Sequence, residues 1–440
     1  MHMKQGRSEQ HSSKKVYLCN MKKILLLFIY TLIIFDIHHG QVLQDSIWSN
    51  SIKTVTLYKN NIDQEAPIIT LNKKDRLMLR FDEISEQPTN YRYRIIHCNS
   101  TWQADSLEPY EYIQGAEDGY IENYNSSFTT LTSYINYFQP IPNEYSEFTT
   151  SGNYALEVFL DEDPDSIVIT RRFYVTENIF NVDIEVTSPT ENKWQNQEVN
   201  ITINNNNPAQ SHLLNSKYLK VVLQQNGRSD NKRILSLSGH SSNKLYYRWH
   251  KENIFEGGNT FRYFDISNIR TPMYNVTKIE HYGSEIYAIL MPEENRSRKN
   301  YETIISLNGG MKTNAWDRND PLTESEYVYV NFLLPMEQPL LNGTIHIVGE
   351  LTNWHLNENS KMEYNSQIKA YTKRMLLKQG YYSYQLLFKE VGTEFGITGK
   401  LEGNHTVTPN TYTAYIYYRM AGDRYERLIA VEQQKPTISK

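Results

Sequence analysis

The sequence predicts an all-β protein built from tandem β-sandwich domains. Beyond residue 41, hydrophobic and polar residues alternate in short runs such as 153–160 (NYALEVFL) and 327–334 (YVYVNFLL). Alternation of this kind places one set of side chains in a core and the other in solvent. The runs are separated by Gly, Asn, Asp and Pro, and no amphipathic helix longer than two turns is evident. Short strands with such turns favour immunoglobulin-like or E-set sandwiches.

The length of 440 residues allows two to four domains, each with its own core. Residues 186–195 (VTSPTENKWQ) interrupt the alternation after a strand, and 319–326 (NDPLTESE) do so again. We therefore expect a first domain at 42–180, a second at 181–320 and a third at 321–432.

The first forty residues contain a targeting signal. Lys22 and Lys23 precede an apolar run at 24–35, and Gly40 supplies a small residue beyond it. Twelve apolar residues are short of the ~20 that span a bilayer but suit the core of a signal peptide. We expect a signal peptide at 21–40, with a membrane anchor as the alternative. A start codon assigned too early would account for the polar residues 1–20.

The chain lacks the usual signatures of catalysis and of metal binding. There is no GxSxG, HExxH, P-loop or GxGxxG motif, and no CxxC or His/Cys cluster. Cys19 precedes the apolar run, so Cys98 alone remains after export and is expected to be a small apolar strand residue. His346 alternates with apolar residues, which predicts a strand histidine facing water. We expect no enzyme, no catalytic residue, no cofactor and no metal.

The net charge of −5 argues against nucleic-acid binding, which requires a basic face. Tyrosine is unusually abundant, with 34 residues against 15 phenylalanines. Tyrosine suits half-buried strands and surfaces, where one end of the ring stays hydrated.

Aromatic residues are concentrated between residues 108 and 148. This segment holds ten aromatic rings and seven acids, without Lys or Arg. Its weak periodicity predicts a long tyrosine-rich loop in the first domain. The rings could serve a substrate, a partner surface or the core of their own domain, and the pattern alone leaves these open.

A second aromatic candidate lies in the third domain. Residues 349–364 (GELTNWHLNENSKMEY), followed by 380–386 (GYYSYQL), resemble the glycogen-binding modules of starch-active enzymes. In those modules exposed rings stack on sugars, and Trp354 is the plausible ring here. The alternatives are a weak glycan contact at Trp354 and a tryptophan of the core or of a sheet edge.

Four stretches together resemble the type IX secretion system plug proteins. They are residues 91–158, which begin YRYRIIHCNSTWQ, and residues 258–270, 324–334 and 401–419. They cover nearly the whole chain beyond the signal peptide, in the order of the family. One departure is TPN at 408–410, where the family typically has TEN and where the proline removes a backbone donor from the turn.

The resemblance implies a non-enzymatic, periplasmic protein on the inner side of the outer membrane. Its expected partner is the giant translocon barrel, whose inner mouth it closes when no cargo is present, with a shuttle protein as an indirect partner. No nucleic acid and no direct membrane insertion are expected. The alternative is a periplasmic or surface carbohydrate-binding β-sandwich protein.

On this reading the tyrosine-rich segment contacts the barrel. Large rings with hydrated hydroxyls suit a polar rim, and a run of acids suits a basic one. The expected partner-binding residues are Tyr110, Tyr112, Tyr120, Tyr124, Tyr134, Tyr137, Phe138 and Tyr145. The alternative is that about half of the rings, among them Phe128, Tyr134 and Phe138, pack under the first sandwich.

Overall fold

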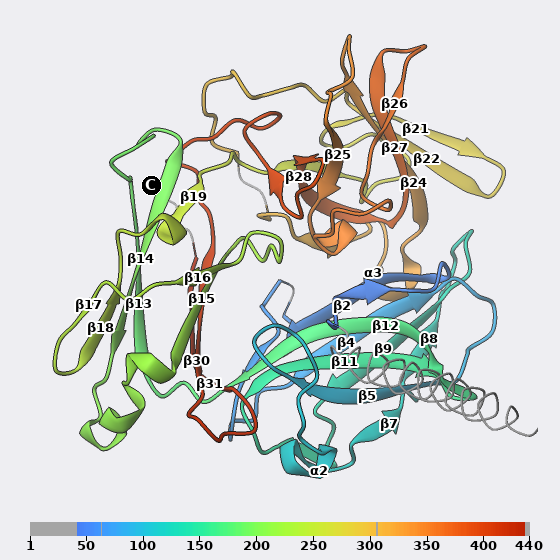
Figure 1. Ribbon diagram of the computed structural model, residues 1–440. Coiled ribbons are helices and arrows are strands. Elements are labelled where there is room, and N and C mark those ends of the chain that lie inside the picture. The colour runs from blue at the N-terminus through green and yellow to red at the C-terminus, as the bar shows by residue number, and fades with distance from the viewer. Residues whose placement is uncertain (1–41, 63, 305–306, 436–440) are drawn as a thin grey trace, which may run out of the picture. The chain divides into compact units, whose positions relative to one another are not determined.

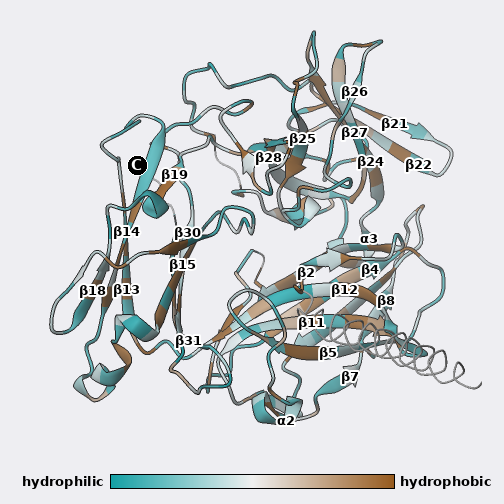
Figure 2. Cartoon of the chain, in the orientation of Figure 1, coloured by the Kyte–Doolittle hydropathy of each residue, from teal (hydrophilic) through white to brown (hydrophobic). Residues whose placement is uncertain are grey.

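The computed structural model describes residues 42–62, 64–304 and 307–435, and strands dominate them. Figure 1 shows these strands and the few short helical turns between them. Figure 2 shows hydrophobic residues interspersed with polar ones along many strands. The expected all-β class with tandem sandwiches is confirmed. The helical turns are α2 (Pro109–Tyr112), α3 (Pro321–Glu324), η1 (Pro208–Leu213), η2 (Ser216–Tyr218), η3 (Lys251–Asn253) and η4 (Glu350–Thr352).

The first sandwich has two main sheets. One sheet has the order β1-β12-β11-β5-β7, with β3 parallel to β12. Its strands are β1 (Ser46–Ile47), β12 (Asp163–Thr176), β11 (Gly152–Leu160), β5 (Tyr91–Cys98), β7 (Asp118–Tyr120) and β3 (Ile68–Thr70). The other has the order β2-β4-β9-β8. Its strands are β2 (Ile52–Lys59), β4 (Leu77–Glu83), β9 (Ile135–Ile141) and β8 (Tyr124–Ser126). A small separate sheet pairs β6 (Ile113–Gly115) with β10 (Ser146–Phe148).

Aromatic rings fill the core of the first sandwich. Phe81 of β4 stacks on Tyr137 of β9 with ring centroids 4.9 Å apart. Phe81 also packs against Tyr91 of the opposite sheet. The two rings are arranged edge to face, with their centroids 5.5 Å apart. Such pairs add to the stabilisation that burial of the rings already provides. The core therefore explains part of the high tyrosine content.

The second sandwich closes with the C-terminal strands. Its first sheet has the order β13-β14-β18-β17, and β19 also pairs with β14. These strands are β13 (Asn181–Thr187), β14 (Asn196–Asn204), β18 (Lys244–Tyr247), β17 (Gly239–His240) and β19 (Ile254–Glu256). Its second sheet has the order β16-β15-β30-β31. These strands are β16 (Arg233–Leu235), β15 (Leu219–Gln225), β30 (Tyr412–Tyr418) and β31 (Arg427–Gln434).

The third sandwich takes its strands from the middle of the chain. In one sheet β28 pairs with β20, β23, β25 and β29. These strands are β20 (Arg262–Asp265), β23 (Met311–Thr313), β25 (Gly343–Val348), β28 (Gly380–Glu390) and β29 (Gly396–Ile397). The other sheet has the order β21-β22-β24-β27-β26, with β22 and β24 parallel. These strands are β21 (Val276–Tyr282), β22 (Glu285–Leu290), β24 (Tyr327–Pro335), β26 (Glu363–Asn365) and β27 (Ala370–Lys378).

Strand pairing crosses the domain boundaries expected after residue 180. The expected third domain, 321–432, includes β30 and most of β31, but β30 pairs with β15 throughout Leu219–Gln225. The expected second domain, 181–320, includes β20 to β23, which pair with strands of the third sandwich. The correction is that the third sandwich lies within the second in sequence. The cause is long-range pairing, which local alternation does not encode.

The three sandwiches contact one another through buried groups. Cys98, Trp102 and Tyr174 of the first pack with Val222 and Tyr415 of the second in one hydrophobic cluster. The rings of Tyr174 and Tyr415 stack at 4.5 Å. Contacts of this kind hold the sandwiches together by removing apolar surface from water.

The expected early start at 1–20 and the signal peptide at 21–40 lie outside the described residues. None of the helices that the described residues form has the length and hydrophobicity needed to cross a bilayer.

Candidate partner-binding surface

The segment from residue 108 to residue 148 folds into five strands and one helical turn, so the expected single loop is wrong in detail. Pro109 opens α2, where the Glu108 and Glu111 side chains form a capping box that satisfies the first backbone N–H groups. The longest strand, β9, pairs with β4 along its whole length. Its aromatic and polar residues form a strand because their polar groups find partners inside the sandwich, as the Asn136 amide does by donating to Asp82 at 2.6 Å.

Four of the expected partner-binding rings are exposed. Tyr110 is 73% exposed, Tyr120 52%, Tyr124 45% and Tyr145 74%. Tyr120 and Tyr124 belong to β7 and β8, which end the two main sheets of the first sandwich and are joined by residues 121–123. Tyr110 lies in α2, which leads into β6, and Tyr145 immediately precedes its partner β10. We name these four residues the tyrosine edge.

Three expected partner-binding rings are buried and therefore belong to the core. The Tyr112 hydroxyl donates to the Ile95 carbonyl at 2.9 Å, and burial raises the pKa of Tyr112 to about 12. The Tyr134 hydroxyl donates to the Ser325 carbonyl at 3.0 Å, and the Tyr137 hydroxyl donates to Glu83 at 3.2 Å. Burial raises the pKa of both phenols above the ordinary value. A partner cannot reach these rings without unfolding the sandwich.

The alternative, that some rings pack under the sandwich, holds for only one of the three rings that it named. Tyr134 is buried as that alternative expects. Phe128 is 68% exposed, and Phe138 is half-buried with the Arg80 guanidinium 5.1 Å from its ring centre. Alternation along β9 explains Phe138, because it points to the face opposite Tyr137.

The segment that carries the tyrosine edge also carries seven acids. Glu111 pairs with Arg424 at 2.6 Å and Asp118 with Arg92 at 2.7 Å. The other five acids of the segment are exposed and have no ion pair among the described residues. They are Glu108, Glu117, Glu122, Glu144 and Glu147. The surface is therefore aromatic and negatively charged.

Trp354, the expected glycan contact, does not form an exposed platform. It is half-buried in the wall of a cavity of about 610 Å³, and its ring meets Phe261 edge to face at 6.1 Å. Two further cavity residues, Arg171 and Arg172, escaped the sequence analysis. The signal for them was the Arg pair within a strand, since neighbouring strand residues point to opposite faces and one arginine had to point inward.

The turn at 408–410 is structural. Thr408 and Asn410 are buried, and the Asn410 amide donates to Gln197 at 2.8 Å and to the Gly257 carbonyl at 2.7 Å. The polar side chains of the turn are therefore engaged within the fold, and only Pro409 is half-exposed.

His346 does not face water, contrary to expectation. It is buried between the hydroxyls of Thr344 and Ser360, and burial lowers its pKa to about 4. Cys98 is a buried free thiol whose pKa burial raises to about 12. Among the described residues, no three His, Cys, Asp or Glu side chains gather as a metal site.

Comparison with known proteins places the first sandwich in a family. The family model described as the first domain of the type 9 secretion system plug protein matches residues 52–177, which begin with β2 and end just beyond β12. No curated protein matches the chain. The crystal structure of a hypothetical protein from Parabacteroides merdae ATCC 43184 superposes with a TM-score of 0.86 and 33% identity, over 90% of this chain and 100% of that one. The chain thus belongs to the type IX secretion system plug protein family and is a component of that system.

Proposed function

We propose that this protein binds the giant outer-membrane translocon barrel of the type IX system and closes its periplasmic mouth when no cargo is present. The shuttle protein is an indirect partner. The protein acts as an obstruction, without a catalytic step and without inserting into the membrane. The observation that carries the proposal is the tyrosine edge, which lies in the domain that the plug family model matches.

The chemistry of the tyrosine edge suits the rim of an aqueous channel. The widest outer-membrane barrels reach about 36 strands, and porin-type interiors are polar. A strongly apolar patch would not remain soluble when it is released, whereas a tyrosine ring combines a large contact area with a hydrated hydroxyl. The five unpaired acids add charge that complements basic residues of a rim.

The backbone of this surface also supports docking. Within the described sheets, β7 pairs only with β5, and β8 only with β9. Their outer edges therefore present N–H and C=O groups to which a strand of a partner can add. The short length of both strands, three residues each, limits uncontrolled pairing with other chains.

Rigidity is the second requirement of an obstruction. A flexible chain in a wide channel would leak, so the sandwiches must hold their arrangement under load. The buried cluster of Trp102, Tyr174 and Tyr415 serves this purpose between the first and second sandwiches. The contact between Tyr134 and the Ser325 carbonyl does so between the first and third.

The family is associated with the cell envelope, and a periplasmic location on the inner side of the outer membrane follows from the proposal. The apolar run at 24–35 behind two lysines supports export as a signal peptide.

Affinity purification of the tagged protein from outer-membrane extracts tests the proposal. We expect the wild-type protein to recover one very large barrel protein. A triple variant with Tyr110→Ser, Tyr120→Ser and Tyr145→Ser should recover at least tenfold less while unfolding at the same denaturant concentration. Substitution of exposed rings leaves the core intact, which keeps the comparison interpretable.

The matched control removes three exposed aromatic residues elsewhere, with Trp249→Ser, Tyr274→Ser and Tyr282→Ser, which are 75%, 65% and 61% exposed. This variant should recover the barrel as the wild type does. Undiminished recovery by the tyrosine-edge variant, or equal loss in both, would remove the tyrosine edge as the contact. Absence of any barrel from the wild-type preparation would remove the proposed function.

A further inference from the structure

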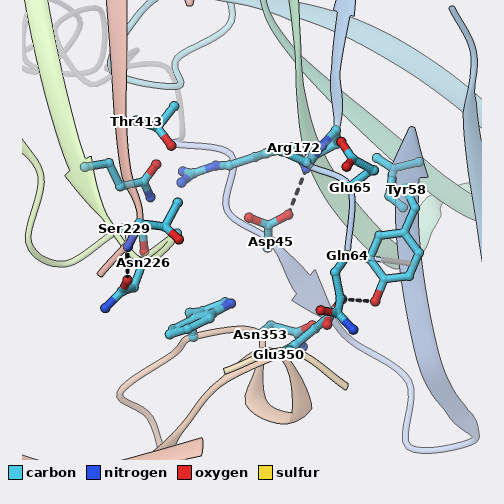
Figure 3. A pocket seen from close by; sticks show the side chains of 18 of the residues that line it. Asp45, Tyr58, Gln64, Glu65, Arg172, Asn226, Ser229, Glu350, Asn353 and Thr413 are labelled. Atoms are coloured by element: carbon cyan, nitrogen blue, oxygen red, sulfur yellow. Dashed lines mark hydrogen bonds between the residues drawn. The ribbon is translucent and has the colours of Figure 1, made fainter. Parts of the chain in front are cut away.

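A cavity of about 610 Å³ has walls from all three sandwiches. Asp45 and Arg172 come from the first, Asn226 and Thr413 from the second, and Glu350 from the third. Figure 3 shows Arg172 reaching into the space between Asp45 and Thr413. The volume lies within the range of small-molecule sites, about 300–1,000 Å³.

Three cationic side chains line the cavity without a carboxylate at ion-pair distance among the described residues. Arg171 is buried and donates to neutral oxygens, the Val55 carbonyl at 3.3 Å and the Asn353 side chain at 2.8 Å. The Nε of Arg172 donates to a backbone carbonyl at 2.6 Å. The guanidinium of Arg172 and the ammonium of Lys232 lie 4.4 and 5.4 Å from the ring centre of Trp102.

The acids of the cavity are largely engaged elsewhere. Glu65 pairs with Lys435 at 3.0 Å, and Glu350 accepts from the hydroxyl of Tyr58 and from the backbone N–H of Met311. Asp45 acts on Arg171 and on Lys232, Glu350 acts on Arg171 as well, and Asp45 also accepts from the backbone N–H of Arg172. The lining holds four cationic side chains against three acids, because Lys435 joins the three cations and Asp45, Glu65 and Glu350 oppose them, so the positive charges are in excess by one.

Removal from water lowers the pKa of each of these three cations. Burial, together with the charge of Arg172 and against the charge of Asp45, lowers the pKa of Lys232 to about 7. Burial also lowers the pKa of Arg171 and of Arg172. An anion in the cavity would relieve this cost by compensating charges that are otherwise removed from water.

The third sandwich contributes a strained loop to the same cavity. Asn353 and Trp354 adopt left-handed backbone conformations, with φ of 52° and 60°. Such a conformation is costly for a tryptophan and persists where the surroundings enforce it, often at ligand sites. Gly309, itself at φ 88°, provides the room, because a Cβ there would lie 2.2 Å from the Trp354 ring. The loop thereby brings Asn353 to Arg171 and places Trp354 in the wall.

Neutral polar groups complete the lining with amides and hydroxyls, namely Gln64, Asn226, Ser229, Asn353, Thr411 and Thr413. An aromatic ring, several amides and hydroxyls, and a surplus of buried and half-buried cations form a combination suited to a hydroxylated anion. We infer that this cavity binds an acidic saccharide, a sugar that carries a carboxylate or a phosphate, either free or at the end of a glycan.

Calorimetric titration of the full chain tests the inference. The probes are D-glucuronate, D-galacturonate, glucose 1-phosphate, a glucuronate-terminated oligosaccharide and neutral glucose, with acetate and inorganic phosphate as simple anions. At least one acidic sugar should bind ten times more tightly than glucose and than the simple anion carrying the same group. Tighter binding of the oligosaccharide would identify a glycan end, and equal affinities a free sugar.

Two substitutions locate the binding. Lys232→Met, which removes a charge without breaking a hydrogen bond among the described residues, should weaken binding at least tenfold, as should Trp354→Leu. Lys251→Met and Trp249→Leu, at exposed positions outside the cavity, should leave the affinity unchanged. Absence of binding by every acidic sugar at millimolar concentration, equal binding of glucose, or equal binding of acetate or phosphate would overturn the inference. Recovery of the translocon barrel by Lys232→Met is expected to stay normal, which separates this site from the proposed plug function.

Discussion

The ammonium of Lys378 donates to the carboxylate of Asp82 at 2.6 Å, and both side chains are buried. Asp82 belongs to β4 of the first sandwich, and Lys378 ends β27 of the third. The same carboxylate accepts from the Tyr327 hydroxyl at 2.6 Å, and the ammonium lies 4.1 Å from the ring centre of Tyr134. This pair joins the family-matched domain to the sandwich inserted later in the chain.

Breaking this buried pair from one side should destabilise the protein strongly. Asp82→Asn leaves the ammonium of Lys378 buried without a counter-charge, which typically costs about 3–5 kcal/mol. We expect the free energy of unfolding to fall by that amount in urea denaturation. The double variant Asp82→Asn with Lys378→Met should recover at least about 1 kcal/mol of the loss.

An exposed pair provides the control. Lys369 and Glu337 are 2.6 Å apart on the surface, and Lys369→Met should change the free energy of unfolding by less than about 1 kcal/mol. If Asp82→Asn were equally mild, the pair would not hold the two sandwiches together.

Tyrosines of the same segment should differ sharply in their effect on stability. Tyr137→Phe removes the hydroxyl that donates to Glu83 and accepts from the backbone N–H of Thr89 at 2.7 Å. Leaving buried polar groups unpaired costs about 1–3 kcal/mol. Tyr145→Phe, at an exposed ring, should fall within about 0.5 kcal/mol of the wild type. Equal losses in thermal unfolding would contradict the division between core rings and the tyrosine edge.

His346 should make stability depend on pH. Its pKa is about 4 in the folded chain, chiefly because of burial and then because of Lys389, against about 6.5 for an unfolded chain. As the pH falls, the unfolded state therefore binds a proton at a higher pH than the folded state does. This contribution is fully present above pH 6.5, is lost as the pH falls toward 4 and amounts to at most about 3 kcal/mol.

His346→Gln, which keeps a polar side chain at the site, should flatten the profile of unfolding free energy between pH 6.5 and 4. An unchanged slope in the variant would assign the acid sensitivity to other groups.

Binding of an acidic sugar should also depend on pH. In contrast to stability, the affinity should increase as the pH falls. An anion favours protonated Lys232, so affinity should rise as the pH falls from 8 to 6, through the pKa of about 7. The groups facing Lys232 are Arg172 and Asp45, with Glu65, Glu350 and Lys435 elsewhere in the cavity wall. Titrations of D-glucuronate at both pH values check this. Lys232→Met should bind with the same weak affinity at pH 6 and pH 8, and a retained pH dependence would exclude Lys232 as its source.

The fold class was predictable because each strand shows the alternation of hydrophobic and polar residues within its own few residues. Residues 327–334 are an example, since they lie within β24 and alternate as expected. The order of the sandwiches was not predictable, because β30 pairs with β15 across almost 200 residues. Such a pairing depends on the packing of the whole chain and not on the local sequence.

The functional surface was predictable only in part. Composition indicated the aromatic segment but not which rings face outward, because β9 buries Tyr137 through polar partners that other strands supply. The cavity could not be predicted, since its walls come from three sandwiches that local patterns do not bring together. The Arg pair at 171 and 172 was the one local sign of it.

The conductance of the purified translocon barrel in a planar bilayer tests the central claim most directly. Adding this protein to the periplasmic side should close most of the current, and the tyrosine-edge triple variant should leave it open while the Trp249/Tyr274/Tyr282 control closes it. A current that the wild-type protein leaves unchanged from that side would contradict the account of this chain as a plug.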